Sequence, residues 1–224
     1  MSINCKNITI KHHRQTILSN FNLELPSNQI IALYGPTGSG KTTLLLLLAG
    51  LLKPYKGGVN VDGIDVFRDI QKARLHVGFG IIPEFNPLLS NLSVEENLMF
   101  QARALKVKHP KENVREIVHN FSLESEKRQR VDHLPALKYA ETGLAMALIG
   151  HPNLVLLDEP EHSLTTEETS TLWNSFDDLI RTGKTIIITT RLRETANRCD
   201  QIVYMPSGKV VDRHELTQNS SSGT

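Results

Sequence analysis

The chain has 224 residues, a length that suits one large domain or a core with a subdomain. It carries 25 Lys and Arg residues against 24 Asp and Glu residues, and this balance argues against a nucleic-acid binder, which is usually more basic. Cys5 and Cys199 lack the spacing of a zinc site or a disulfide framework, which favours a reducing, cytosolic compartment. The N-terminus has no signal-peptide core, and the longest apolar run, Leu44–Ala49, is too short to span a bilayer. We therefore expect a soluble chain whose membrane role, if it has one, comes through a partner.

The first third of the chain predicts strands around one helix. Short β elements are expected over residues 1–34, and the last of them, Gln29–Tyr34, is apolar throughout, as in a strand buried on both faces. The segment Lys41–Leu52 is rich in leucine and ends at a Lys-Pro pair, which predicts a helix and its stop. An Asp-Gly pair between alternating apolar residues indicates a β-hairpin over Val59–Val66.

The rest of the chain continues this alternation of strands and helices. Residues 85–150 are mostly helical in pattern, and Ser93 and Glu96 form a capping box within them. The other expected elements are strands at Val77–Ile82, Asn153–Leu157, Lys184–Thr189 and Gln201–Met205, and a helix at Thr166–Thr182. Because several strands are wholly apolar and alternate with helices, the sequence predicts an α/β fold with a mostly parallel sheet and an inserted helical subdomain.

The segment GPTGSGKT fits the pattern G-x-x-x-x-G-K-[ST] between a predicted buried strand and a predicted helix. Glycines let backbone N–H groups converge on phosphate oxygens, and the helix points its N-terminus at them. Lys41 supplies a cation to the outer phosphates, and Thr42 supplies a hydroxyl ligand to Mg²⁺. A simple turn would not need this context, so we predict a site for ATP and Mg²⁺. Its expected nucleotide-binding residues are Gly35, Pro36, Thr37, Gly38, Ser39, Gly40, Lys41, Thr42 and Thr43.

A second acidic motif follows the predicted strand that ends at Leu157. Asp158 and Glu159 would lie at the carboxyl end of this strand, where ligands bind in open α/β sheets. Asp158 is then expected to hold Mg²⁺ through water, and Glu159 to polarise the water that attacks the γ-phosphate, beside Lys41 as the second catalytic residue. Taken alone, the pair would be interpreted as an acidic helix cap or a surface turn; the P-loop favours the catalytic interpretation.

The segments GPTGSGKTTLLLLLAGLLKP and LLDEP resemble the two Walker motifs of ABC-transporter ATPase subunits. GIIPEFNPLLSNLSVEENL resembles the Q-loop region of that family, in particular of the exporter branch whose membrane domains are separate chains. The resemblance covers about residues 3–213 and implies a P-loop NTPase core with an antiparallel β subdomain near the N-terminus. It divides the chain into an ATP-binding core at 1–84 and 151–213, a helical subdomain at 85–150 and a disordered tail at 214–224.

The family's Leu-Ser-Gly-Gly-Gln signature falls on Leu134-Pro135-Ala136-Leu137-Lys138, where only the leucine is kept. In the family this motif presents a hydroxyl and glycine N–H groups to the γ-phosphate across a dimer interface. Pro135 has neither a hydroxyl nor an N–H, although it suits the first position of a helix. Leu137 adds a bulky side chain where glycine allowed close approach, and Lys138 is left as the one candidate for a new charge contact.

Four further family positions differ in this chain. The Q-loop glutamine aligns with Glu84, which is expected to touch Mg²⁺ or its waters, and the switch histidine aligns with Arg191. Arginine cannot shuttle a proton, but it can neutralise γ-phosphate charge. The D-loop aspartate aligns with Thr165, which forms a capping box with Glu168. His12 stands where the family has an aromatic ring on adenine; weak stacking and a solvent-exposed loop histidine are both open.

The resemblance implies a peripheral subunit at the cytoplasmic face of the cell membrane, with membrane-spanning transporter subunits and a second ABC ATPase chain as partners. Because a broken signature damages the partner's nucleotide site, a heterodimer is favoured, while a homodimer that uses Lys138 stays open. Two functions follow: a transport motor with weakened hydrolysis, or a regulatory or structural subunit that binds ATP without efficient turnover. A soluble ABC protein acting on ribosomes or DNA is disfavoured, since the chain has one ATPase unit and no heptad run.

Overall fold

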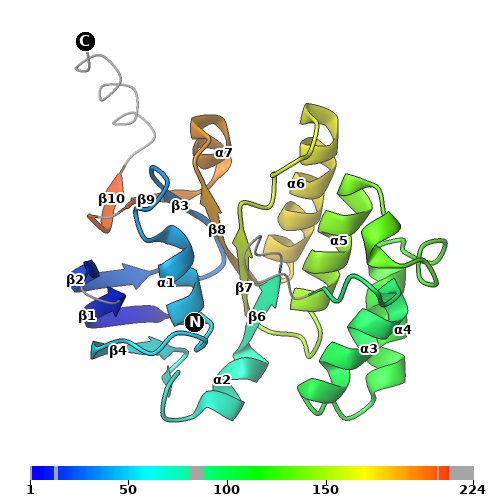
Figure 1. The fold of residues 1–224 in the computed structure, drawn as a ribbon, viewed down its shortest axis with the longest axis horizontal. Coiled ribbons are helices and arrows are strands. Elements are labelled where there is room, and N and C mark those ends of the chain that lie inside the picture. The colour runs from blue at the N-terminus through cyan, green and yellow to red at the C-terminus, as the bar shows by residue number, and fades with distance from the viewer. Residues whose placement is uncertain (1, 13–14, 81–87, 206, 212–224) are drawn as a thin grey trace.

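The structure of the protein is a computed structural model, and it describes residues 2–12, 15–80, 88–205 and 207–211. Two sheets and eight helical segments of these residues form an α/β fold (Figure 1). Within the described ranges, no helix is both long enough and apolar enough to cross a membrane.

The N-terminal sheet is antiparallel, with strand order β2-β1-β4-β5. Its strands are β1 (Ile3–His12), β2 (Gln15–Leu25), β4 (Lys56–Val61) and β5 (Ile64–Asp65). Asp62 and Gly63 turn the chain between β4 and β5 with φ of 55° and 77°, and this left-handed pair is the turn that an Asp-Gly sequence favours in a hairpin. The predicted hairpin is thus confirmed, whereas β1 and β2 are longer than the short elements expected, because each pairs along most of its length.

The central sheet has the order β10-β9-β3-β8-β7-β6, and every neighbouring pair is parallel except β9 with β10. Its strands are β3 (Ile30–Tyr34), β6 (Val77–Gly80), β7 (Leu154–Asp158), β8 (Thr185–Thr190), β9 (Gln201–Tyr204) and β10 (Lys209–Val211). Strands β3, β7 and β8 are buried along nearly their whole length, which is why they have no polar alternation. The predicted α/β class with a mostly parallel sheet is confirmed.

Helices cover both faces of the central sheet. Alternate residues of β3, β7 and β8 pack into two hydrophobic cores, one shared with α1, α2 and the antiparallel sheet and one shared with the helices from α3 to α7. Figure 1 shows α1 beside the antiparallel strands and α3, α4 and α5 grouped at the opposite side. The helices are α1 (Lys41–Leu48), α2 (Ile70–His76), α3 (Val94–Ala104), α4 (Pro110–Asn120), the 3-10 turn η1 (Val131–His133), α5 (Ala136–Ala147), α6 (Thr166–Arg181) and α7 (Arg193–Arg198).

The helical stretch from α3 to α5 lies in the chain between β6 and β7, which are neighbours in the sheet. An insertion at this point leaves the sheet order unbroken. The capping box of Ser93 and Glu96 is present at the start of α3, as predicted. The domain boundaries given above stay predictions, and the tail at 214–224 lies outside the described residues.

Two expected helix ends differ from the sequence prediction. Helix α1 ends at Leu48 rather than Leu52, since Gly50 has a φ of 69° and the chain leaves the helical conformation there. Pro135 is the residue before α5 rather than its first residue, and its ψ of 152° is extended. The helix therefore begins at Ala136, one residue later than expected.

Candidate active site

The P-loop connects the end of β3 to the start of α1. Gly35 lies against the segment that follows β9, and a Cβ there would meet the carbonyl oxygen of Met205 at 2.6 Å. Gly40 precedes α1 with a φ of 90°, a left-handed conformation that side chains disfavour. These two glycines are required by the backbone path, so the loop can curl around the helix N-terminus.

Donors converge at this loop. Helix α1 has no side-chain cap and no acidic residue in its first turn, so its first N–H groups face the loop without an internal anion. The ammonium of Lys41 is buried and donates to the carbonyl oxygens of Gly35 at 2.9 Å and Pro36 at 3.0 Å. The hydroxyl of Ser39 is also buried and has no hydrogen-bond partner among the residues that the structure describes. Such a concentration of donors fits a polyphosphate.

The charge of Lys41 is set by its surroundings. Burial lowers the pKa of its ammonium, while the carboxylates of Glu159 and Asp158 oppose that effect. An incoming phosphate adds negative charge and favours the protonated form further.

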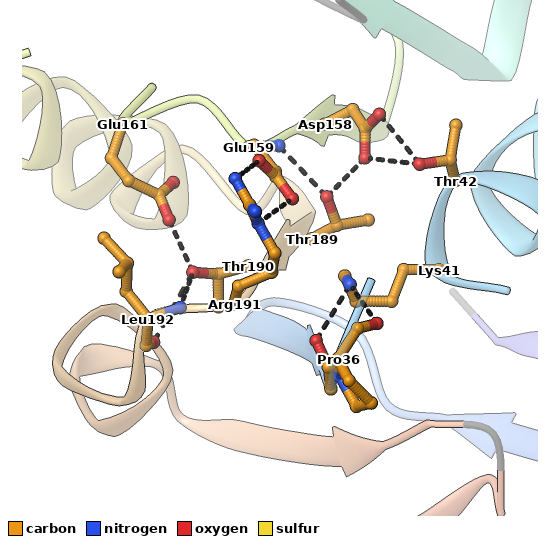
Figure 2. A network of polar contacts seen from close by, with 11 residues as sticks. Pro36, Lys41, Thr42, Asp158, Glu159, Glu161, Thr189, Thr190, Arg191 and Leu192 are labelled. Atoms are coloured by element: carbon orange, nitrogen blue, oxygen red, sulfur yellow. Dashed lines mark hydrogen bonds and ion pairs between the residues drawn. The ribbon is translucent and has the colours of Figure 1, made fainter. Parts of the chain in front are cut away.

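Asp158 ends β7 and faces α1. Both of its oxygens accept from the Thr42 hydroxyl, at 3.0 Å and 3.1 Å, and one also accepts from the hydroxyl of Thr189 on β8 (Figure 2). Burial raises the pKa of Asp158, and the hydrogen bonds from Thr189 and Thr42 counteract part of this effect. A nearby cation would stabilise the charged form.

The pairing of Thr42 with Asp158 is also a donor set that suits Mg²⁺. The described residues contain no group of three or more His, Cys, Asp or Glu side chains able to hold a metal. Mg²⁺ does not need one, because it binds through one or two protein oxygens and takes its other ligands from phosphates and water. The hydroxyl and carboxylate would therefore hold the ion against the phosphates and supply electrostatic stabilisation there.

Glu159 follows directly and has an unusual backbone. Its φ is 44°, and its N–H donates to both the carbonyl and the hydroxyl oxygen of Thr189. Its carboxylate pairs with Arg191, whose Nε lies 2.9 Å from one oxygen and whose terminal nitrogen lies 3.0 Å from the other (Figure 2). Left-handed backbone at a non-glycine residue is a feature that clusters at functional sites.

Sequence reasoning missed one carboxylate of this region, Glu161. It is 9% exposed, accepts from the hydroxyl of Thr190, and has a second oxygen without a hydrogen-bond partner. Burial raises its pKa, against the opposing hydrogen bond from Thr190. The sequence offered one indication of Glu161, its position two residues after Glu159. Its burial comes from packing against the end of β8, and this long-range contact is not visible in the local sequence.

The signature positions lie at the N-terminus of α5. Lys138 is paired with Glu141 at 2.9 Å and its ammonium lies 3.4 Å from the carbonyl oxygen of Ser122. The carboxylate of Glu168 closes the capping box of α6, and hydrogen bonds from the backbone and side chain of Thr165 lower its pKa. The backbone of Leu137 lowers it slightly further, so this carboxylate lies close to the start of α5.

Two expected site residues are not assigned by the structure. Glu84 lies outside the described residues. His12 is the last residue of β1, and its contact with adenine stays a prediction. The D-loop position Thr165 is the N-cap of α6, as its capping box predicted.

Comparison with known proteins agrees with this arrangement. A family model described as ABC transporter matches residues 18–162. The Nod factor export ATP-binding protein I of Cupriavidus metallidurans is 31% identical over 94% of this chain and 71% of its own length. Its counterpart in Rhizobium meliloti is 28% identical over 94% of the chain and 63% of its own length. A probable multidrug ABC transporter ATP-binding protein of Escherichia coli is 29% identical, and the match covers 36% of that protein.

Solved structures share the fold. The dimeric, post-hydrolysis state of an ATP-binding cassette bound to ADP and Pi has a TM-score of 0.80 at 23% identity, covering 94% of this chain and 98% of that one. A bacterial Atm1-family ABC exporter with ATP bound also has a TM-score of 0.80, at 18% identity, over 99% of this chain and 40% of that one.

Fold and site together define a P-loop ATPase cassette. The chain belongs to the ABC transporter family, and within it to the ATP-binding subunits. It is thus an ABC-type ATPase, and ATP is its nucleotide.

Proposed function

We propose that this chain powers an exporter, with MgATP held on Gly35–Thr43 and hydrolysed with Glu159 as general base. The unpartnered Ser39 hydroxyl, the free N-terminus of α1 and the buried Lys41 ammonium support the phosphate site. The hydroxyl of Thr42 beside Asp158 supports the Mg²⁺ site. Export is supported by the names of the relatives, which are a Nod factor export protein and a multidrug transporter protein.

The partners follow from how the cassette works. ABC cassettes act as pairs on membrane-spanning domains, and the proposed location is peripheral, at the cytoplasmic face of the cell membrane. A site is completed when the signature of one cassette meets the P-loop of the other. We therefore propose membrane-spanning subunits and a second ATPase chain as the partners.

The signature face of this chain is formed by Leu134–Lys138 at the start of α5. Its contacts support the proposal that hydrolysis by this chain depends on its partner. Pro135 offers no N–H donor, and the carboxylate of Glu168 lies close to the backbone N–H of Leu137. Lys138 is held by Glu141, so the homodimer alternative in which Lys138 replaces the lost donors loses support. A nucleotide presented to this face by a partner would meet a carboxylate instead of the family's serine and glycines. We expect the site formed over it to turn ATP over slowly.

Turnover by the purified chain alone tests this proposal. In a homodimer both sites would lack signature donors, and losing one preorganised donor can cost about 10²–10³ in rate. We expect ATP binding in titration calorimetry but negligible steady-state ATPase activity. Turnover of about one per second, the low end for ordinary enzymes, that disappears in Glu159→Gln would contradict the proposal.

A regulatory subunit that never turns ATP over is the second candidate, and the engagement of Glu159 by Arg191 favours it. Reconstitution separates the two. If the chain is combined with its membrane partners and an ATPase chain that carries an intact signature, a motor subunit gains turnover that Glu159→Gln removes. For a regulatory subunit the same substitution leaves the turnover of the complex unchanged.

A further inference from the structure

Arg191 and Glu159 meet as a two-pronged ion pair. Nε and one terminal nitrogen of the guanidinium bind the two different oxygens of the carboxylate, at 2.9 Å and 3.0 Å. The Glu159 side chain is 22% exposed and that of Arg191 49%. Paired donors that match both oxygens make this the strongest geometry for a carboxylate and a cation.

Both members of this pair are positioned by backbone contacts. The N–H of Glu159 donates to Thr189, which fixes the residue in its left-handed conformation. On the other side, the N–H of Leu192 donates to the hydroxyl of Thr190 at 2.9 Å, and that hydroxyl donates to Glu161. The turn that carries Arg191 is therefore tied to the segment that carries Glu159, and Figure 2 shows the two side chains lying against each other between these ties.

The ion pair with Arg191 affects how Glu159 can act as a general base. A general base must lie within hydrogen-bond reach of the water whose proton it takes. Both oxygens of Glu159 already accept from Arg191, so a water would have to compete with a charged, bidentate donor. In this arrangement Arg191 engages one acceptor position on each oxygen of the carboxylate, so the base meets the water with part of its capacity already used.

The charge of Arg191 is also felt in the phosphate site. Burial is the main cause that lowers the pKa of Lys41, and the positive charge of Arg191 lowers it further. A guanidinium fits phosphate oxygens as well as it fits a carboxylate. A γ-phosphate beside Lys41 would thus present Arg191 with a second, more highly charged partner.

We propose that Arg191 is a positioning residue that acts as a latch: it holds Glu159 when no γ-phosphate is present and releases it by moving to the γ-phosphate of bound ATP. This rests on the proposed function, since it needs ATP on the P-loop. It couples availability of the base to the presence of an intact triphosphate. ADP, which has no γ-phosphate, leaves the latch closed.

A double-mutant cycle on the full chain tests the latch. The affinities of ATP and ADP are measured for the wild type, Arg191→Ala, Glu159→Ala and the double variant. The latch predicts that Arg191→Ala weakens ATP binding about tenfold when Glu159 is absent, because a charged contact to phosphate is lost outright. With Glu159 present the same substitution should weaken ATP binding less, since Arg191 must first leave the carboxylate. ADP affinity should stay the same in all four proteins.

Two other arrangements give different results. If Arg191 stays on Glu159 when ATP binds, it makes no contact with the γ-phosphate while Glu159 is present, so Arg191→Ala leaves ATP affinity unchanged in that background and lowers it only in the Glu159→Ala background. If the pair has no role, the two backgrounds give equal effects. Either result overturns the latch. Loss of ADP binding would signal misfolding of Arg191→Ala, and Arg191→Gln then takes its place in the cycle.

Two controls separate failure of the latch from failure of the proposed function. Arg181→Ala removes another arginine with a carboxylate partner, Asp178 at 2.6 Å, far along α6, and should change neither affinity. Lys41→Ala should weaken both nucleotides. If the wild type binds neither nucleotide, the proposed function fails and the latch fails with it. If both nucleotides bind normally, but Arg191→Ala changes ATP affinity equally in the two Glu159 backgrounds or not at all while Glu159 is present, only the latch is overturned.

Discussion

At the scale of single residues, the phosphate site places opposite charges together before any ligand binds. Lys41 is buried with two backbone carbonyls as acceptors, and Asp158 is buried with two threonine hydroxyls as donors. Burial shifts both pKa values toward the neutral forms. If MgATP binds as proposed, it supplies an anion to Lys41 and a cation to Asp158, and both penalties are relieved at once.

Removing the Lys41 ammonium should therefore weaken ATP binding. A charge-assisted contact to phosphate is worth about 1.5–3 kcal/mol, so Lys41→Ala is expected to raise the Kd for ATP by about tenfold or more in titration calorimetry. Lys184→Ala is the matched control. Lys184 is another lysine whose pKa is lowered by burial and that donates to a backbone carbonyl, that of Pro152 at 2.7 Å, but it lies at the opposite end of β8. Equal affinity in wild type and Lys41→Ala would show that the site is assigned wrongly.

At the scale of elements, the active site is a junction between the ends of β7 and β8. Asp158 contacts Thr189, Glu159 contacts Thr189 and Arg191, and Glu161 contacts Thr190. Three carboxylates within four residues, those of Asp158, Glu159 and Glu161, are thus attached to the end of β8 that leads into α7. Any movement of Arg191 would be transmitted through these contacts.

Glu161, like Asp158, is a member of this junction whose charge destabilises the fold. Its folded-state pKa is raised above the ordinary value of 4.5, so the penalty of its buried charge is fully present above the raised pKa and disappears as the pH falls from there to below 4.5. Glu161→Gln keeps an oxygen for Thr190 and removes the charge. We expect its Tm to exceed that of the wild type at neutral pH, and the difference to shrink as the pH approaches 4.5.

Thermal unfolding followed by circular dichroism across this pH range measures the effect. Glu24→Gln serves as the control, because Glu24 is an exposed carboxylate on β2 and its replacement removes no buried charge. A Glu161→Gln variant that is less stable than the wild type at neutral pH would mean that the carboxylate has a charged partner when folded.

The features that the sequence predicted well are local ones, formed by residues close together in the chain or within one motif. The P-loop, the Asp158-Glu159 pair at a strand end and both capping boxes depend on residues a few positions apart and were found where expected. The ion pair of Glu159 with Arg191 joins residues 32 apart, and the burial of Glu161 depends on the same strand pairing. Sequence reasoning gave Arg191 a role at the γ-phosphate but had no means of finding its contact with Glu159.

At the scale of the whole molecule, the two faces that would meet nucleotide differ. The P-loop face, Gly35–Thr43 with Asp158 and Glu159, has the uncapped start of α1 and two carboxylates. The signature face has the carboxylate of Glu168 close to its helix start and a lysine that is paired with Glu141. Walker residues act on the chain's own ATP, and a signature acts on the partner's ATP. If the proposed function holds, a chain with two such different faces would be half of an asymmetric pair.

We expect this asymmetry to be visible in the composition of the native complex. Two copies of this chain would leave both P-loops without signature donors, while a second ATPase chain with an intact signature would complete the site on Lys41 and Glu159. Native mass spectrometry of the complex purified from its source should then give one copy of this chain, one copy of a different ATPase chain and the membrane-spanning subunits. In that complex, Lys41→Ala or Glu159→Gln in this chain should abolish most turnover, because the competent site is the one on its P-loop. The equivalent substitutions in the partner chain should cost little, since that site lies over Leu137 and Glu168. Two copies of this chain on the membrane subunits, with no second ATPase present, would contradict the heterodimer.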